Sequence, residues 1–280
     1  MILFKTAAAT SEFLSSKEKT GTKIGFIPTM GALHKGHISL IAFAKQAGEF
    51  CVCSIFVNPT QFNDKTDFEK YPSTIEKDID GLEKAGCDMV FLPGIQEIYP
   101  NGTENETPYP LGFLETVLEG AYRPGHFQGV CQVVNRLLSV IKPHHLYLGQ
   151  KDYQQCMVIK QFIALTHRST LTVICPTLRE EDGLAMSSRN LRLKAQERKN
   201  AFRIYETLSF IKKSLRPGYL EDLKTRGRQY LVAEGFKVDY VEIADAGTLE
   251  LQENWDGSHP LVALVAAYLN EVRLIDNMLL

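Results

Sequence analysis

Two histidines three residues apart are framed by glycines in the segment Met30–His37, which reads M-G-A-L-H-K-G-H. The segment lies between a short apolar run and an amphipathic stretch, so it joins a predicted strand to a predicted helix. Gly31 and Gly36 allow a ligand to approach the backbone closely, and the unpaired N–H groups at a helix start attract phosphate. Placed on one helical face, His34 and His37 could donate to phosphate oxygens as negative charge develops.

Two other interpretations of the histidine pair stay open. The pair could be half of a zinc site, although no third ligand stands nearby at a recognisable spacing. It could also be structural, as a lone histidine usually is. A glycine-framed pair at a strand–helix junction is less often so.

A second segment, Gly149–Gln155, also follows a predicted strand and opens a predicted helix. Lys151 offers a point charge for phosphate, and Asp152 could cap the helix or hold a ribose hydroxyl. Gln155 lies in the first helical turn. Taken alone, a lysine–aspartate pair at a helix start is more often a solvated cap.

Three further segments carry groups that could bind anions or hydroxyls. In residues 178–190, two serines beside Arg189 could wrap a triphosphate, although a polar linker would look the same. Gln61, in N-P-T-Q-F, is a neutral bidentate group suited to a hydroxyl or carboxylate, or else a turn residue. Arg123, in Y-R-P-G-H-F, is a candidate anion contact.

The elements that must position these segments alternate between strand and helix. Short apolar runs predict strands at residues 24–28, 50–57, 87–92, 145–148 and 171–175. Helical spacing predicts helices over residues 38–47, 73–85, 130–141 and 152–165. This alternation predicts an α/β fold with a Rossmann-like, doubly wound parallel sheet and helices on both faces. The segments of the histidine pair, Lys151 and Gln61 then follow strands at the crevice end of the sheet.

The composition and the hydrophobic pattern of the chain change near residue 177. A polar, glycine-containing stretch is followed by helical patterns over residues 195–215 and 221–234, then by β-rich runs at 238–243 and 261–269. We therefore predict two domains, residues 1–176 and a smaller α+β domain of residues 177–280.

Composition limits the classes of function. The 280 residues are 44% hydrophobic and carry a formal net charge of −2, so no basic excess favours nucleic acid or an anionic membrane. No apolar run approaches the roughly 20 residues of a membrane span, and the N-terminus lacks a signal-peptide pattern, so we expect a cytoplasmic protein. Six cysteines without a C-x-x-C pair predict small buried hydrophobes, with a metal or redox role as the alternative.

Together the five segments resemble the pantothenate synthetases. P-T-M-G-A-L-H-x-G-H looks like that family's version of the H-I-G-H signature of class I aminoacyl-tRNA synthetases and related nucleotidyltransferases, and M-S-S-R-N resembles the counterpart of their K-M-S-K-S loop. The strings N-P-x-Q-F, R-P-G-H-F-x-G-V and G-x-K-D-Y-Q-Q are specific to the family in this order. The resemblance is strong from Lys23 to Asn190, with small departures at Lys35, Ser73 and Leu148.

The resemblance implies an AMP-forming ligase that condenses (R)-pantoate with β-alanine through a pantoyl-adenylate and releases AMP and pyrophosphate. Residues 1–176 would bind ATP and pantoate, and residues 177–280 would cover the active site. Magnesium would be held mainly by the ATP phosphates, with no dedicated metal residue, and the protein would be a homodimer. A nucleotidyltransferase that releases a nucleotide-linked product is the main alternative. A small tRNA-ligating enzyme or a non-enzymatic nucleotide-binding module fits less well.

Carried over residue by residue, the resemblance implies a role for each matching position. The catalytic residues are His37, as proton donor, with His34 and Lys151. The ATP-binding residues are Met30, Gly31, Ala32, Leu33, His34, Lys35, Gly36, His37, Gly149, Gln150, Lys151, Asp152, Leu178, Met186, Ser187, Ser188 and Arg189. Gln61 and Gln155 bind pantoate, and Gln61 also lies near β-alanine. The polar residues 179–190 are expected to be weakly packed without ATP.

Overall fold

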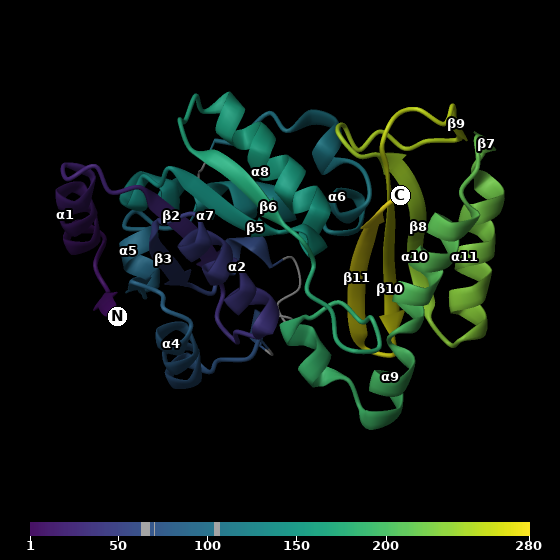
Figure 1. The fold of residues 1–280 in the computed structure, drawn as a ribbon, viewed down its shortest axis with the longest axis horizontal. Coiled ribbons are helices and arrows are strands. Elements are labelled where there is room, and N and C mark those ends of the chain that lie inside the picture. Colours follow the sequence, from purple (N-terminus) through teal and green to yellow (C-terminus); the bar gives the residue numbers. More distant parts are fainter. Residues whose placement is uncertain (63–67, 70, 104–106) are drawn as a thin grey trace. The chain divides into compact units, whose positions relative to one another are not determined.

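The chain forms two compact units in the computed structural model, which describes residues 1–62, 68–69, 71–103 and 107–280 (Figure 1). Unit 1 comprises Met1–Gly149 and Val158–Pro176, and unit 2 comprises Gln150–Met157 and Thr177–Leu280. Within those described ranges, none of the helices combines the length and the apolar character of a membrane span.

Unit 1 is built on a six-stranded sheet whose order is β1-β4-β3-β2-β5-β6 and whose pairings are all parallel. The strands are β1 (Ile2–Phe4), β2 (Ile24–Thr29), β3 (Phe50–Ile55), β4 (Met89–Phe91), β5 (His145–Gly149) and β6 (Leu171–Cys175). The order reverses between β2 and β5, so this pair is the switch point where open α/β sheets bind ligands. The predicted parallel sheet is confirmed.

Helices cover both faces of this sheet. They are α1 (Ala7–Glu18), α2 (Lys35–Gln46), α4 (Ile75–Lys84), α5 (Ile95–Ile98), α6 (Glu119–Tyr122), α7 (His126–Ile141) and α8 (Tyr153–Leu165), the last beginning in unit 2. On one face, Ile27 and Cys53 pack in a cluster with Leu40 of α2. The alternate residues Phe26 and Val52 are also fully buried. Because side chains alternate along a strand, both faces must be covered.

All six cysteines are buried free thiols, as expected for small core residues. The apolar pattern did not mark β1 and α1 at the N-terminus of unit 1, nor the short helices α5 and α6. β1 pairs with β4 and completes the edge of the sheet.

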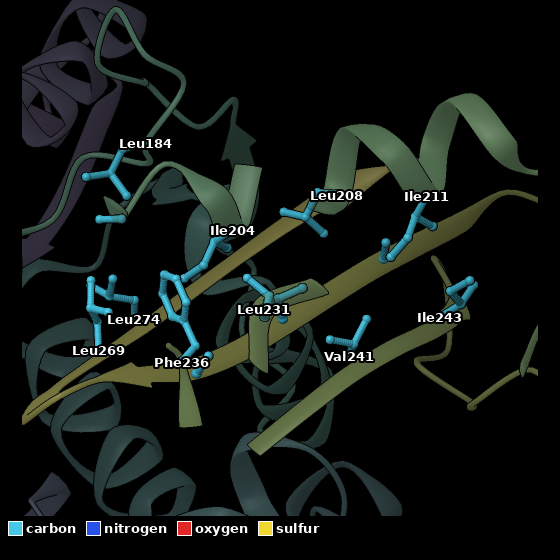
Figure 2. Close-up of a cluster of buried hydrophobic side chains, with 14 of the residues drawn as sticks. Leu184, Ile204, Leu208, Ile211, Leu231, Phe236, Val241, Ile243, Leu269 and Leu274 are labelled. Atoms are coloured by element: carbon cyan, nitrogen blue, oxygen red, sulfur yellow. The ribbon is translucent and has the colours of Figure 1, made fainter. Parts of the chain in front are cut away.

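Unit 2 contains a three-stranded antiparallel sheet of order β11-β10-β8. Its elements are α9 (Ala195–Asn200), α10 (Arg203–Ser214), α11 (Glu221–Ala233), β8 (Lys237–Asp245), β10 (Leu261–Leu269), β11 (Val272–Leu279) and the short pair β7 (Gly218–Tyr219) and β9 (Asn254–Trp255). Figure 2 shows the core in which Leu208 and Ile211 of α10 and Leu231 of α11 pack with Val241 and Ile243 of β8.

Two predictions for unit 2 need correction. The helix predicted over residues 195–215 is two helices, α9 and α10, which Ala201 and Phe202 separate. The apolar spacing continues through the break, because Ala201 belongs to the same buried cluster as Ile204. Strand β11 was not predicted, because its sequence V-R-L-I-D-N-M-L places two polar residues where they are in fact buried.

Candidate active site

The turn between β2 and α2 has an unusual backbone. Gly31 and Ala32 both have positive φ, +83° and +50°. A Cβ atom on Gly31 would stand 3.1 Å from the carboxylate of Asp78. A left-handed conformation suits glycine but costs an alanine on the order of 1–3 kcal/mol. The turn therefore needs a compensating interaction.

Asp78, in the first turn of α4, supplies that interaction. Its carboxylate is 1% exposed. Oδ2 accepts from the N–H of Ala32 at 2.8 Å, and Oδ1 accepts from the N–H of Leu33 at 2.8 Å and from the Thr74 hydroxyl at 3.0 Å. Each hydrogen bond to a charged group contributes about 1.5–3 kcal/mol, enough to offset the strain. Sequence reasoning missed Asp78; the available signal was an acidic residue in line with Leu82 on the buried face of a helix.

The two histidines meet at the start of α2. His34 is the residue that caps the helix, and its Nδ1 accepts from the N–H of Gly36 at 3.1 Å. The Nδ1 of His37 accepts from the N–H of His34 at 3.3 Å, and the ring centroids are 4.0 Å apart. A neutral imidazole that accepts at Nδ1 carries its proton on Nε2. Both rings are thus oriented as Nε2–H donors at a helix N-terminus, where phosphate binds well.

Gln61 lies beside the same turn, in a 3₁₀ turn at Pro59–Gln61 that follows β3. Its Nε2 lies 2.8 Å from the sulfur of Met30, and its Oε1 accepts from Asn58 at 3.3 Å. Asn58 is 1% exposed and is held in turn by the hydroxyl of Tyr99 at 2.9 Å. The structure therefore brings together Met30 and Gln61, two residues that were predicted to bind different substrates.

His126, at the start of α7, supports Gln61 from the other side. Its Nδ1 lies 2.7 Å from the backbone oxygen of Gln61, and its Nε2 lies 3.1 Å from the guanidinium of Arg123. An Nδ1–H that donates to the carbonyl leaves Nε2 to accept from Arg123. Arg123, the candidate anion contact, therefore also orients a residue that holds the Gln61 backbone. Glu119 lies 3.8 Å from the same guanidinium.

In unit 2, residues Gln150–Asp152 form a 3₁₀ turn that leads into α8. Lys151 is about five-sixths buried, with 16% of its side chain exposed, and donates to Asp152 at 3.4 Å. Gln155 is half-buried on the first turn of α8. Gly149, the last residue of β5, belongs to unit 1.

Residues 178–186 form a tight hairpin rather than an open linker. Leu178 accepts from the N–H of Met186 at 3.1 Å, and Leu184 accepts from the N–H of Glu180 at 2.8 Å. Leu184 is 4% exposed, and Ala185, beside it, is also buried. The hairpin is better packed than the polar composition indicated.

The residues beyond the hairpin carry the serine pair. The hydroxyl of Ser187 accepts from the N–H of Arg189 at 3.3 Å and opens a 3₁₀ turn over Ser188–Arg192. Ser188 is buried, whereas Met186 and Arg189 are half-buried and Leu178 is exposed. In the described part of the chain, no three His, Cys, Asp or Glu side chains gather closely enough to hold a metal ion.

Comparison with known proteins identifies the family. A model of the Pantoate-beta-alanine ligase family matches residues 2–279. The pantothenate synthetases of Bacteroides fragilis and Porphyromonas gingivalis are each 43% identical to this chain, the first over 95% of this chain and 94% of that protein, the second over 99% of both.

Solved structures agree with the sequence matches. The pantothenate synthetase of Thermus thermophilus has a TM-score of 0.90 at 37% identity and covers 99% of both chains. The pantoate-beta-alanine ligase of Francisella tularensis, solved in complex with Beta-gamma ATP and β-alanine, has a TM-score of 0.82 at 38% identity over 100% of this chain and 97% of that one. These matches confirm the predicted resemblance and fold class: the chain belongs to the pantoate–β-alanine ligase family.

Proposed function

We propose that this protein condenses (R)-pantoate with β-alanine to form pantothenate, consuming ATP and forming a pantoyl-adenylate on the way. The observation that carries this proposal is the His34–His37 pair, held as Nε2–H donors at the start of α2 in a turn that also contacts Gln61. The family match over residues 2–279 supplies the substrates.

The chemistry follows from the weakness of a carboxylate as an electrophile. A carboxylate oxygen of pantoate attacks the α-phosphorus of ATP, the bond from that phosphorus to the bridging oxygen breaks, and pyrophosphate leaves. The amine of β-alanine then attacks the acyl carbon, AMP leaves with the electrons of the acyl–oxygen bond, and the nitrogen loses a proton. Neither step needs a covalent nucleophile from the protein, so positioning and charge stabilisation carry the rate.

In unit 1, the proposed roles follow the hydrogen bonds. His37 and His34 donate from Nε2 to phosphate oxygens whose charge grows as pyrophosphate departs. The turn Met30–Gly36 presents its backbone to ATP. Gln61, fixed by Asn58, uses its amide to place pantoate and then β-alanine.

In unit 2, the proposed roles concern the nucleotide. Lys151 neutralises charge at the α-phosphate, next to Gly149, Gln150 and Asp152. Leu178, an exposed apolar side chain, packs on adenine, and Gln155 binds pantoate. Met186, Ser187, Ser188 and Arg189 close over the triphosphate.

Magnesium fits this arrangement as a companion of ATP. The described residues offer no carboxylate cage, so the phosphate oxygens and water would hold the ion. Its contribution when bound is to neutralise phosphate charge. We further propose a homodimer that acts in the cytoplasm, as the family resemblance implies.

Product analysis tests the proposal. Purified protein is incubated with ATP, magnesium, pantoate and β-alanine, with each omitted in turn. Repeated turnover to AMP, pyrophosphate and pantothenate is expected only in the complete mixture. A stable nucleotide-linked product that persists when β-alanine is present would instead indicate a nucleotidyltransferase.

A further inference from the structure

Two adjacent polar residues are buried in β11, a strand to which the proposed mechanism assigns nothing. Asp276 is 5% exposed and Asn277 is 2% exposed. Burying such groups is costly unless their hydrogen bonds are made. Successive side chains of a strand point to opposite faces, so the two residues can hold different segments of unit 2.

Asn277 holds the turn that carries Lys151. Its Nδ2 donates to the backbone oxygens of Gln150 at 2.9 Å and Lys151 at 2.8 Å. Its Oδ1 accepts from the side-chain amide of Gln150 at 3.2 Å. The side-chain amide of Asn277 therefore makes all of these hydrogen bonds to one turn. They fix the carbonyl groups that precede and follow the Cα of Lys151.

Asp276 holds the hairpin that leads to the serine pair. Its carboxylate accepts two hydrogen bonds from Arg179, at 2.6 Å and 3.1 Å, and one from the N–H of Asn277 at 2.7 Å. Burial raises the pKa of Asp276, and the ion pair with Arg179 opposes that shift. Arg179 also donates to the backbone oxygen of Gly183 at 3.0 Å and lies over the ring of Tyr205, 4.9 Å from its centroid.

The hydrogen bonds of Asp276 and those of Asn277 are connected to each other. Besides the bond from its own N–H to Asp276, Asn277 accepts at its backbone oxygen from Arg179 at 3.2 Å. A single pair of residues in β11 is thus hydrogen-bonded to the turn at Gln150–Asp152 and, through Arg179, to the hairpin at 178–186.

We infer that Asp276 and Asn277 are positioning residues for adenylate formation, which hold Lys151 and the hairpin at 178–186, from which the triphosphate-binding residues follow, in one fixed arrangement within unit 2. This inference rests on the proposed function. A misplacement of about 1 Å can slow a reaction roughly 10²-fold, so we expect the loss of such a supporting residue to lower activity by up to about 100-fold.

The chain offers a matched control on the same strand. Arg273 of β11 donates to Asp239 of β8 at 2.8 Å, and their side chains are 15% and 10% exposed. This ion pair also joins charged groups of low exposure in unit 2, but it links two strands of the sheet. Asp239→Asn therefore reports the loss of an ion pair in the same unit.

The first experiment measures the placement of the segments, independently of turnover. Hydrogen exchange is followed in wild type, Asn277→Ala, Asp276→Asn and Asp239→Asn. We expect faster exchange at residues 150–153 in Asn277→Ala and at residues 179–185 in Asp276→Asn, with both segments unchanged in Asp239→Asn. Unchanged exchange at 150–153 in a folded Asn277→Ala overturns the inference.

The second experiment measures the reaction. Single-turnover adenylate formation at saturating ATP should slow about 10- to 100-fold in Asn277→Ala, with a smaller change in the KM for ATP and less than a threefold change in Asp239→Asn. Because Asn277 acts through Lys151, its loss in a Lys151→Ala background should slow the reaction less than about threefold. An equal loss in both backgrounds, or a loss no larger than that of Asp239→Asn, overturns the inference.

Two further comparisons distinguish a folding defect from a loss of positioning, and failure of this inference from failure of the proposed function. If Asn277→Ala does not fold, Asn277→Ser removes the same amide while keeping a small polar side chain, and the same losses are expected of it. A wild-type protein that forms no pantoyl-adenylate from ATP and pantoate would overturn the proposed function, and with it the role in adenylation. The exchange experiment would still decide whether β11 places the two segments.

Discussion

Gly129 of α7 is a position where one added methyl group should displace Gln61. A Cβ atom there would stand 2.2 Å from the backbone oxygen of Thr60 and 2.8 Å from the Cα of Gln61. Both atoms belong to backbone, so no side-chain rotation can relieve the clash. We predict that Gly129→Ala pushes the 3₁₀ turn away from α7 and impairs the use of pantoate.

The size of the effect follows from the geometry. Ordinary contact begins near 3.4 Å, so the separation from Thr60 must grow by 3.4 − 2.2, about 1.2 Å. A misplacement of about 1 Å can cost roughly 10²-fold in rate. Overpacking should destabilise by about 1–3 kcal/mol, less the gain of roughly 1 kcal/mol when alanine replaces glycine in a helix. We expect a net loss of about 0–2 kcal/mol.

Gly81 of α4 provides the matched control, because a Cβ atom there would meet its nearest neighbour, the Cδ1 of Ile38, at 3.8 Å. Gly81→Ala should keep full activity and melt at the same or a higher temperature. The assay is kcat and KM for pantoate, with a thermal melt for each variant. If Gly129→Ala is folded and its kcat/KM for pantoate lies within threefold of wild type, the reasoning about this contact is wrong.

Three further predictions concern single side chains. His37→Ala should lower kcat more than it raises the KM for ATP, by roughly 10²–10³-fold, as for other oxyanion donors; adenylate formation within threefold of wild type in a folded variant would make His37 structural. Gln61→Ala should raise the KM for pantoate as well as slow turnover, and an unchanged KM would contradict its placing role. Burial disfavours the charged form of Asp245, but the N–H groups of Thr248 and Gly247 donate to it and lower its pKa. The Asp245 carboxylate therefore stabilises the fold fully above the unfolded pKa of about 4. This stabilisation is lost as the pH falls through the lowered pKa of the folded state. In urea unfolding, the free energy of unfolding of wild type should therefore exceed that of Asp245→Asn at pH 7, and the difference should close near pH 2. A difference that stays constant with pH would refute this.

The sheet of unit 1 could be predicted because its strands read as continuous apolar runs, and β2, β3 and β4 at its centre are buried on both faces. Residues 171–175, predicted as a strand, are β6 to the residue. The candidate motifs could also be recognised from the sequence, since Gly31 and the histidines stand at a strand–helix junction. That junction is the carboxyl end of β2, at the switch point of the sheet.

The residues that hold those motifs could not be predicted, because each acts over a long sequence separation. Asp78 bonds to the N–H of Ala32, 46 positions away, and Asn277 bonds to the carbonyl of Lys151, 126 positions away. Local pattern can mark a polar residue on a buried face, as at Asp78, but it does not identify the distant partner. No strand was predicted at β11, whose adjacent polar residues Asp276 and Asn277 are nevertheless buried.

The measurement that tests the central claim most directly is exchange of labelled pyrophosphate into ATP. Adenylation precedes amide formation in this account, so exchange should require pantoate and proceed without β-alanine. The nucleotide product of the complete reaction should be AMP. Exchange that demands β-alanine, or a complete reaction that yields ADP and phosphate, would contradict the adenylate mechanism and indicate an acyl-phosphate route instead.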